Sequence, residues 1–188
     1  MKVVVLATTN QGKLVELREM LGAGWVVKSP ADYPGLPEVD ETEATFAGNA
    51  ELKARALCAA TGELSVGDDS GLCVDALKGG PGVYSARYAP TTEARIAKLL
   101  RALEGVADRS AHFECALCAV WPDGRVERAT GVCEGRIALV PRGQGGFGYD
   151  PVFEFADGRT MAELSSAEKA AVSHRGAAFR ALVMALSS

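Results

Sequence analysis

The first 22 residues hold the pattern that most restricts the fold, a β-rich apolar run followed directly by helical periodicity. The run KVVVLAT (residues 2–8) is rich in valine and predicts a strand. In the next segment Leu14, Leu17 and Leu21 recur at helical spacing, and Gly22 suits the end of a helix. A strand, a polar turn and a helix in this order are typical of the start of an α/β fold.

The alternation of strands and helices continues along the chain. WVVKS (residues 25–29) predicts a second strand. Thr45 suits the cap of a helix in which Phe46 and Leu57 belong to an apolar stripe. A further helix is predicted over residues 91–103.

The second half of the chain adds a hairpin and more helix. Residues 111–140 form two alternating runs around Pro-Asp-Gly, which predicts a long hairpin. A glycine-rich loop follows at residues 143–155, and residues 165–186 predict one or two helices. Helices interleaved with strands, together with a hairpin, favour an α/β fold with a mixed sheet.

Composition narrows the class of protein. The chain has 188 residues, of which 48% are hydrophobic and 23% charged, so we expect a single globular domain over residues 1–188. A net charge of −4 argues against a nucleic-acid polymer as partner, because such binding needs a basic face. With no transmembrane run and no signal-peptide core, we expect a cytoplasmic protein without a membrane partner.

The five cysteines are odd in number and lie in apolar contexts, as in a reducing compartment, so no disulfide framework is implied. Cys115 and Cys118 form a C-x-x-C near His112, which raises a zinc or redox site as an alternative. The surrounding residues alternate like a strand, however, and side chains three apart on a strand point to opposite faces. No second pair completes a four-ligand set, so a metal or redox role is disfavoured.

The hexapeptide TTNQGK follows the first predicted strand and opens the first predicted helix. Free backbone N–H groups and the positive end of the helix dipole favour an anion there, and Lys13 adds a mobile cation. It is not a Walker loop, because the first glycine and the Ser/Thr after the lysine are missing. Helix capping by Thr9 or Asn10 is the alternative interpretation. The candidate anion-binding residues are Thr8, Thr9, Asn10, Gln11, Gly12 and Lys13.

Two adjacent carboxylates, Asp68 and Asp69, follow a short apolar run, where a buried strand is expected to end. One interpretation is a loop-end Asx turn with both groups solvated. The other is that a divalent cation relieves their repulsion, since Mg²⁺ takes oxygen ligands from one or two carboxylates, waters and substrate phosphates. Glu41, in the preceding loop, can supply another oxygen. An anion-binding helix start with acidic metal ligands suggests hydrolysis at phosphorus.

Six stretches spread over nearly the whole chain resemble the Ham1/inosine triphosphate pyrophosphatase family. They are, in order, TTNQGK, TFAGNAELKA, DDSGL, GGPGVYSARY, GGFGYDPVF and SHRG. The resemblance implies a two-lobed single α/β domain with a long twisted mixed β-sheet flanked by helices, and an active site in the cleft between the lobes. It also implies a homodimer that uses Mg²⁺ to hydrolyse deaminated purine nucleoside triphosphates (ITP, dITP, XTP) to the monophosphate and pyrophosphate.

The same resemblance implies roles for single residues. Glu41 and Asp69 would hold the metal and the attacking water, with Asp69 as base, and Lys53 and Asp68 would complete the catalytic group. Whether Asp68 or Asp69 is the base, and whether Asp69 is metal ligand, base or both, stays open. Thr8, Asn10 and Lys13 would bind the triphosphate. The other residues implied in substrate binding are Ser70, Phe147, Gly148, Tyr149, Asp150, Lys169, His174 and Arg175.

Several of these residues also have ordinary structural interpretations. Lys53 on an exposed helix face would be solvated, Tyr149 would pack beneath its loop, and His174 would pack or cap a helix. Phe147 differs, because glycines around it offer little packing, so a face for stacking a base explains it better.

The chain departs from the family pattern at two places: Glu43 stands where many members have Gly, and Cys73 replaces the usual Ala. Neither change removes a proposed catalytic group. Two other functions stay open, a nucleotide-binding sensor without turnover and a pyrophosphatase for other modified nucleotides. The feature that excludes guanine is not identified from the sequence.

Overall fold

The computed structural model describes residues 1–36 and 39–187. Its strands and helices are β1 (Lys2–Leu6), α1 (Gln11–Leu21), β2 (Trp25–Lys28), α2 (Phe46–Thr61), β3 (Ser65–Val74), β4 (Gly80–Pro81), α3 (Thr92–Ala102), β5 (Ser110–Val120), β6 (Val126–Ile137), β7 (Phe153–Glu154), α4 (Ser166–Val172) and α5 (His174–Ser187). None of the helices in this part of the chain is both long enough and apolar enough to cross a membrane.

The strands form a mixed sheet, which confirms the predicted α/β class. Among the described residues the sheet has the order β2-β1-β3-β5-β6-β7, and β4 pairs with β3. β1 runs parallel to both β2 and β3, whereas β4 and β7 pair antiparallel with β3 and β6. The chain divides into two compact units, and β3, β5 and β6 contribute residues to both.

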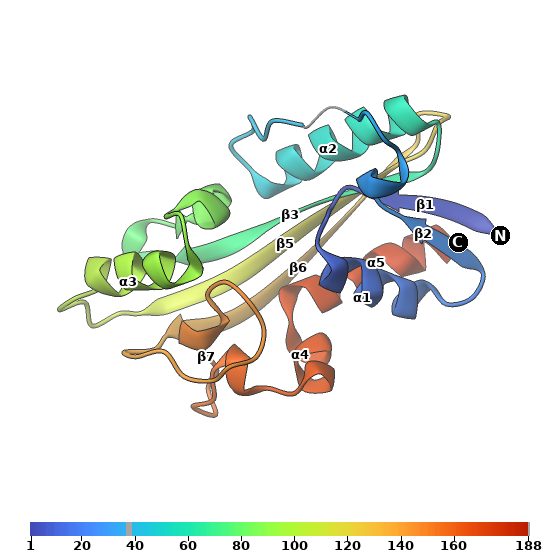
Figure 1. The fold of residues 1–188 in the computed structure, drawn as a ribbon. Helices are drawn as coiled ribbons and strands as arrows, with labels where there is room; N and C mark the ends of the chain where they lie inside the picture. Colours follow the sequence, from blue (N-terminus) through green and yellow to red (C-terminus); the bar gives the residue numbers. More distant parts are fainter. Residues whose placement is uncertain (37–38, 188) are drawn as a thin grey trace. The chain divides into compact units, whose positions relative to one another are not determined.

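The first unit contains Met1–Asp69, Cys115–Gly131 and the C-terminal segment from Gly176. Within it, α1 and α5 lie on one side of the strands and α2 on the other (Figure 1). Leu14 and Leu17 of α1 and Phe179 and Leu182 of α5 are fully buried in one apolar cluster with β1. This packing holds the first turn of α1, which contains the last three residues of the TTNQGK stretch.

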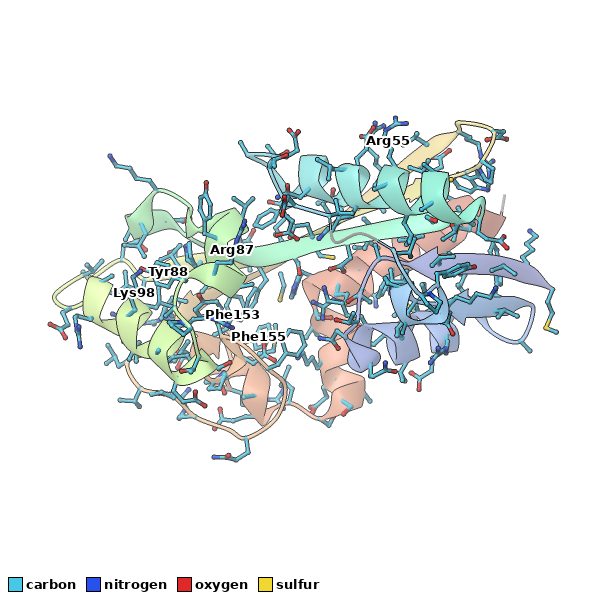
Figure 2. The ribbon with its side chains drawn as sticks, turned by 45° about the horizontal axis from the view of Figure 1, so that its top comes forward. Arg55, Arg87, Tyr88, Lys98, Phe153 and Phe155 are labelled. Carbon is cyan, nitrogen blue, oxygen red and sulfur yellow. The ribbon has the colours of Figure 1, made fainter. Side chains whose placement is uncertain are left out.

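The second unit contains Ser70–Glu114 and Val132–Arg175. Its core joins Leu99 of α3 with an aromatic group in which the ring of Phe153 lies 4.5 Å from that of Phe113 and 5.6 Å from that of Phe155. The Lys98 ammonium of α3 lies 4.1 Å from the ring centroid of Tyr88. Figure 2 labels Phe153, Phe155, Lys98 and Tyr88. This core fixes the glycine-rich loop that precedes β7.

Most predicted helix ends are confirmed. Asn10 caps α1 by accepting hydrogen bonds from backbone N–H groups, and Gly22 ends that helix in a positive-φ conformation. Thr45 caps α2 by accepting from Gly48 N. The last predicted helical segment is two helices, α4 and α5, separated at Ser173, whose backbone is extended.

One prediction about β3 is wrong. The strand does not end at the adjacent carboxylates but continues through Asp68 and Asp69 to Val74, and both aspartates are buried, with 2% and 7% of their surface exposed. The solvated Asx turn is therefore also wrong. Successive side chains of a strand point to opposite faces, so the two carboxylates are kept apart and each meets a different partner.

Candidate functional site

The start of α1 contributes a cation and a capped helix end. Asn10 Oδ1 accepts from Gly12 N at 2.9 Å and from Lys13 N at 3.4 Å, so the capping interpretation is correct for this residue. Thr8, Thr9 and Lys13 line a cavity of about 540 Å³, whose described lining residues do not include Gln11 or Gly12. Hydroxyl groups and the Lys13 ammonium are therefore this segment's donors toward the cavity.

Asp68 faces α1. Its carboxylate forms an ion pair with Lys13, whose side chain is mostly buried. The Cys115 thiol of β5 donates to the other oxygen of Asp68 at 3.7 Å. Because burial of an unpaired charge is costly, the Lys13 ammonium is what allows a carboxylate to sit in the middle of a buried strand.

Asp69 belongs to the opposite face and meets α2. Asn49 Nδ2 donates to Asp69 Oδ2 at 3.0 Å, and the Lys53 ammonium lies 4.0 Å from Asp69 Oδ1. Lys53 also forms an ion pair with Glu41 at 2.6 Å. Only 14% of the Lys53 side chain is exposed, so the interpretation of a solvated lysine does not hold.

Gly67 explains why α2 reaches Asp69. A Cβ atom at Gly67 would lie 1.8 Å from the carbonyl oxygen of Ala50 and 2.9 Å from Ala54 N. The helix backbone thus lies directly on the strand, which only glycine permits. One turn of α2 then places Asn49 and Lys53 on the side that faces Asp69.

The environment of Asp69 raises its pKa. Burial is the largest cause, and repulsion from Glu41 and Asp68 acts in the same direction. The Lys53 ammonium and the hydrogen bond from Asn49 oppose it. A raised pKa increases the tendency of this carboxylate to accept a proton.

The donor set of the first unit fits a magnesium ion. No three His, Cys, Asp or Glu side chains converge as a metal-ligand group in the part of the chain that the structure describes. Mg²⁺, however, commonly takes only one or two protein carboxylates and completes its shell with waters and substrate phosphates. Glu41 and Asp69 both approach one cation, Lys53, and their repulsion contributes to the raised pKa of Asp69. A divalent ion would relieve that repulsion.

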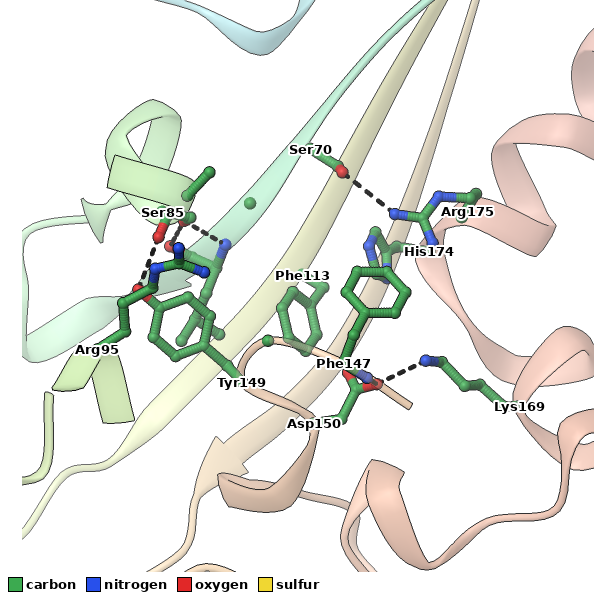
Figure 3. Close-up of a pocket in the computed structure, with 14 residues that line it drawn as sticks. Ser70, Ser85, Arg95, Phe113, Phe147, Tyr149, Asp150, Lys169, His174 and Arg175 are labelled. Carbon is green, nitrogen blue, oxygen red and sulfur yellow. Dashed lines mark hydrogen bonds and ion pairs between the residues drawn. The ribbon is translucent and has the colours of Figure 1, made fainter. Parts of the chain in front are cut away.

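A second cavity, of about 120 Å³, lies in the second unit (Figure 3). Ser70, Phe147, Gly148, Tyr149, Asp150, Lys169, His174 and Arg175, all predicted from the sequence, are among its lining residues. The structure therefore brings together the predicted residues of the glycine-rich loop, α4 and the SHRG stretch.

Phe147 presents an aromatic surface in this cavity. Its side chain is 51% exposed, as expected for a residue outside the core. The Lys169 ammonium lies 4.7 Å and the Arg175 guanidinium 5.2 Å from its ring centroid (Figure 3). Arg175 also donates to Ser70 Oγ at 3.4 Å. The wall thus combines a flat apolar ring with strong hydrogen-bond donors.

Asp150 fixes the loop that carries Phe147. Its Oδ2 accepts from Phe147 N at 2.8 Å and from the Lys169 ammonium at 2.5 Å. Gly146 has φ of +73°, and a Cβ there would lie 1.9 Å from the same oxygen. A residue other than glycine at this position would displace the carboxylate and the loop.

His174 and Tyr149 are both buried. The imidazole of His174 stacks on Phe113, with centroids 4.8 Å apart and planes 13° from parallel. Tyr149 donates its hydroxyl to the carbonyl of Ser85 at 2.9 Å, and burial raises its pKa to about 12. Tyr149 therefore packs beneath its loop, as the structural interpretation of the sequence predicts, and it also lines the cavity.

Asn49, Arg95, Phe113 and Ser85 are among the residues of these two sites that sequence reasoning missed. Asn49 lies inside the quoted TFAGNAELKA stretch, and a polar residue on the apolar face of a helix was the available signal. Arg95, Phe113 and Ser85 line the second cavity. Ser85 lies inside the quoted GGPGVYSARY stretch, whereas Arg95 and Phe113 come from elements with no motif of their own.

The two departures from the family pattern have simple structural settings. The backbone N–H of Glu43 donates to Asn49 Oδ1 at 3.0 Å, so this residue helps to hold Asn49 through its main chain. Cys73 is buried in β3, and burial raises the pKa of its thiol to about 11. All five cysteines lie in the part of the chain that the structure describes, where none of them forms a disulfide, and all are buried.

Comparison with known proteins agrees over the full length. The Ham1 family model matches residues 4–185. A dITP/XTP pyrophosphatase of Gloeobacter violaceus is 52% identical over 190 aligned positions, covering 100% of this chain and 95% of the relative. The dITP/XTP pyrophosphatase of Desulforamulus reducens is 50% identical, covering 94% of this chain and 92% of the relative.

Solved structures agree as well. The structure of a HAM1 protein from Coxiella burnetii is 41% identical, covers 100% of this chain and 99% of its own, and gives a TM-score of 0.94. A nucleoside-triphosphatase, dITP/XTP pyrophosphatase, from Mycobacterium abscessus is 43% identical, covers 98% and 99%, and gives a TM-score of 0.81. On these grounds the chain belongs to the Ham1 family.

Proposed function

We propose that this protein hydrolyses deaminated purine nucleoside triphosphates, ITP, dITP and XTP, to the nucleoside monophosphate and pyrophosphate. The observation that carries the proposal is the buried Asp69 of β3, held by Asn49 and faced by Lys53 and Glu41. Relatives covering the whole chain carry the name dITP/XTP pyrophosphatase, which supports the same reaction.

In this proposal the first unit handles the phosphates. Asp69 accepts a proton from the water that attacks the α-phosphorus, and the bond between that phosphorus and the oxygen that bridges it to the β-phosphorus breaks, so this oxygen leaves with pyrophosphate. Lys13 and Lys53 neutralise the charge that grows on the leaving pyrophosphate, and the hydroxyls of Thr8 and Thr9 orient it.

Glu41 and Asp69 are the residues that would hold Mg²⁺. When bound, the ion supplies positive charge that offsets the charge of the triphosphate and of its leaving group. Lys13 and Lys53 contribute positive charge to the same cavity. We therefore expect removal of one lysine and removal of the metal to slow the same step, the departure of pyrophosphate.

The second unit would take the base. Phe147 offers a face for stacking, and Arg175, Lys169 and His174 offer donors for the C6 carbonyl that hypoxanthine and xanthine share. Adenine has an amino group at that position, which would leave two donors facing each other. The unpaired group lowers kcat/KM for adenine nucleotides, relative to the deaminated ones, by about tenfold to more than a hundredfold.

A homodimer in the cytoplasm, with no nucleic-acid polymer as partner, belongs to the same proposal. Five cysteines without a disulfide among the described residues support a reducing compartment. The negative net charge supports small anionic substrates held by local cations.

Hydrolysis of ITP in ¹⁸O-labelled water with Mg²⁺ tests the reaction. We expect pyrophosphate as product and the label in the monophosphate, because water enters at the α-phosphorus. Label only in the pyrophosphate would place attack at the β-phosphorus and contradict the role given to Asp69. Release of orthophosphate would contradict the reaction itself.

Asp69→Asn is the matched variant, since it keeps the shape of the side chain and removes its charge. We expect at least about a hundredfold loss of turnover with an unchanged circular dichroism spectrum. A folded variant with activity within a few-fold of the parent would exclude Asp69 as base. A parent protein that binds ITP without turnover would instead identify a sensor.

A further inference from the structure

We propose that Arg95 of α3 contacts the substituent at C2 of the purine and so favours xanthine over guanine. The inference rests on the proposed function in one respect, that the cavity of the second unit takes the base. Donors for the C6 carbonyl cannot produce a difference in affinity between xanthine and guanine, because both bases have that carbonyl. A contact at C2 can.

Arg95 lines the cavity, and its side chain is half-buried. Its Nε donates to the carbonyl of Ala89 at 2.9 Å, which fixes the stem of the guanidinium. Figure 3 shows the guanidinium beside Tyr149, on the other side of the cavity from Arg175 and Lys169. The charge of Arg95 acts on Tyr149, where it opposes the rise of the pKa that burial causes.

The outer nitrogens of Arg95 are available to a ligand. Lys169, on the other wall, is paired with Asp150 at 2.5 Å. Within residues 1–36 and 39–187, by contrast, no carboxylate forms an ion pair with Arg95. A guanidinium has five N–H donors, and the bond to Ala89 uses one of them. The cavity therefore has fixed, charged donors on two walls.

The chemistry of C2 separates the three bases. Xanthine has a carbonyl at C2, which accepts a hydrogen bond. Guanine has an amino group, which donates, and hypoxanthine has only a hydrogen atom. Because arginine only donates, it pairs with xanthine, is neutral toward hypoxanthine and leaves the amino group of guanine facing another donor. Bonds from a charged donor are stronger than neutral ones.

The test is the binding of the three monophosphates XMP, IMP and GMP to the full-length protein, measured by isothermal titration calorimetry. Arg95→Met keeps the length of the stem and removes every donor. Arg101→Met is the matched control, since Arg101 is an exposed residue of the same helix that does not line the cavity. Both variants remove one positive charge, so a general loss of attraction for phosphate appears in both.

For Arg95→Met we expect affinity for XMP relative to IMP to fall about tenfold or more, and affinity for GMP relative to IMP to rise. Glutamine offers an acceptor as well as a donor, so Arg95→Gln should raise the affinity for GMP relative to IMP further than Arg95→Met does. In Arg101→Met both affinity ratios, XMP to IMP and GMP to IMP, should equal those of the parent.

Equal loss for all three nucleotides in Arg95→Met would overturn the inference, as would a parent that binds none of them. Binding is measured without turnover, so this result is independent of the ¹⁸O experiment. A protein that fails to hydrolyse ITP but shows the expected ratios would contradict the proposed reaction and keep the role of Arg95. Thermal unfolding of each variant, compared with the parent, verifies that it is folded.

Discussion

Gly67→Ala is the change that most directly tests how the fold builds the phosphate site. The added methyl group would lie 1.8 Å from the carbonyl oxygen of Ala50, while an ordinary contact begins at 3.4 Å. About 1.6 Å of movement is therefore needed. The atoms that the new Cβ would meet belong to the backbone of α2, so no side-chain rotation can supply this movement. Helix α2 must shift away from β3.

The size of the effect follows from that shift. Overpacking of a buried contact lowers the free energy of unfolding by about 1–3 kcal/mol, and a backbone contact belongs at the upper end of this range. The Asn49–Asp69 hydrogen bond is 3.0 Å long, so a helix movement of this size breaks it. Since misplacement of a catalytic group by about 1 Å can lower the rate by about a hundredfold, kcat should fall by a similar factor.

Urea unfolding and ITP turnover with Mg²⁺ measure the two effects. Gly24→Ala is the control, because no atom lies within 4 Å of a Cβ added there and Gly24 has no positive φ. We expect Gly24→Ala to change the free energy of unfolding by no more than about 0.5 kcal/mol. If Gly67→Ala matched the control in both stability and kcat, the close contact of α2 with β3 would be refuted.

Three further predictions concern single side chains. Asp69→Asn, in the presence of a chelator, should be at least as stable as the parent at pH 7, because the raised pKa of Asp69 means that its charged form destabilises the fold. The difference in the free energy of unfolding should vanish as the pH falls through and below the folded pKa of Asp69. A variant less stable than the parent at pH 7 would contradict this. Asn49→Leu should lower kcat more than it raises KM, because Asn49 orients Asp69, and an unchanged kcat would make Asn49 a packing residue only. Arg175→Ala should lower kcat/KM for ITP more than for ATP, whereas equal losses would make Arg175 a phosphate or structural residue.

Local signals in the sequence were sufficient for most elements of the fold. The spacing of Leu14 and Leu17, with Gly22 after them, predicts α1 correctly, because its capping residues and apolar face are all local. The same holds for Thr45 at the start of α2. The continuation of β3 through Asp68 and Asp69 is not predictable in this way, since the partners that neutralise the charges come from distant segments.

The candidate site shows the same division. Residues of the quoted motifs gather in the two cavities, as the resemblance to the family implies. Arg95 and Phe113 have no motif, and their presence in the second cavity depends on how α3 and β5 pack in that unit. Gln11 and Gly12 belong to a motif, but Asn10 uses the backbone N–H of Gly12 to cap the helix.

The two adjacent carboxylates are compatible with a buried strand because the strand itself separates them. On a helix or in a turn, consecutive carboxylates share one environment, and their repulsion raises the pKa of one of them. On β3, Asp68 meets Lys13 on one face, and Asp69 meets Asn49 and Lys53 on the other. Asp68 is then fixed as the partner of Lys13, for which we propose phosphate binding, while Asp69, with a lysine only at 4.0 Å, keeps a raised pKa. Because Asp68 and Asp69 lie on opposite faces of β3, each has its own partners, and two identical side chains can differ in their chemistry.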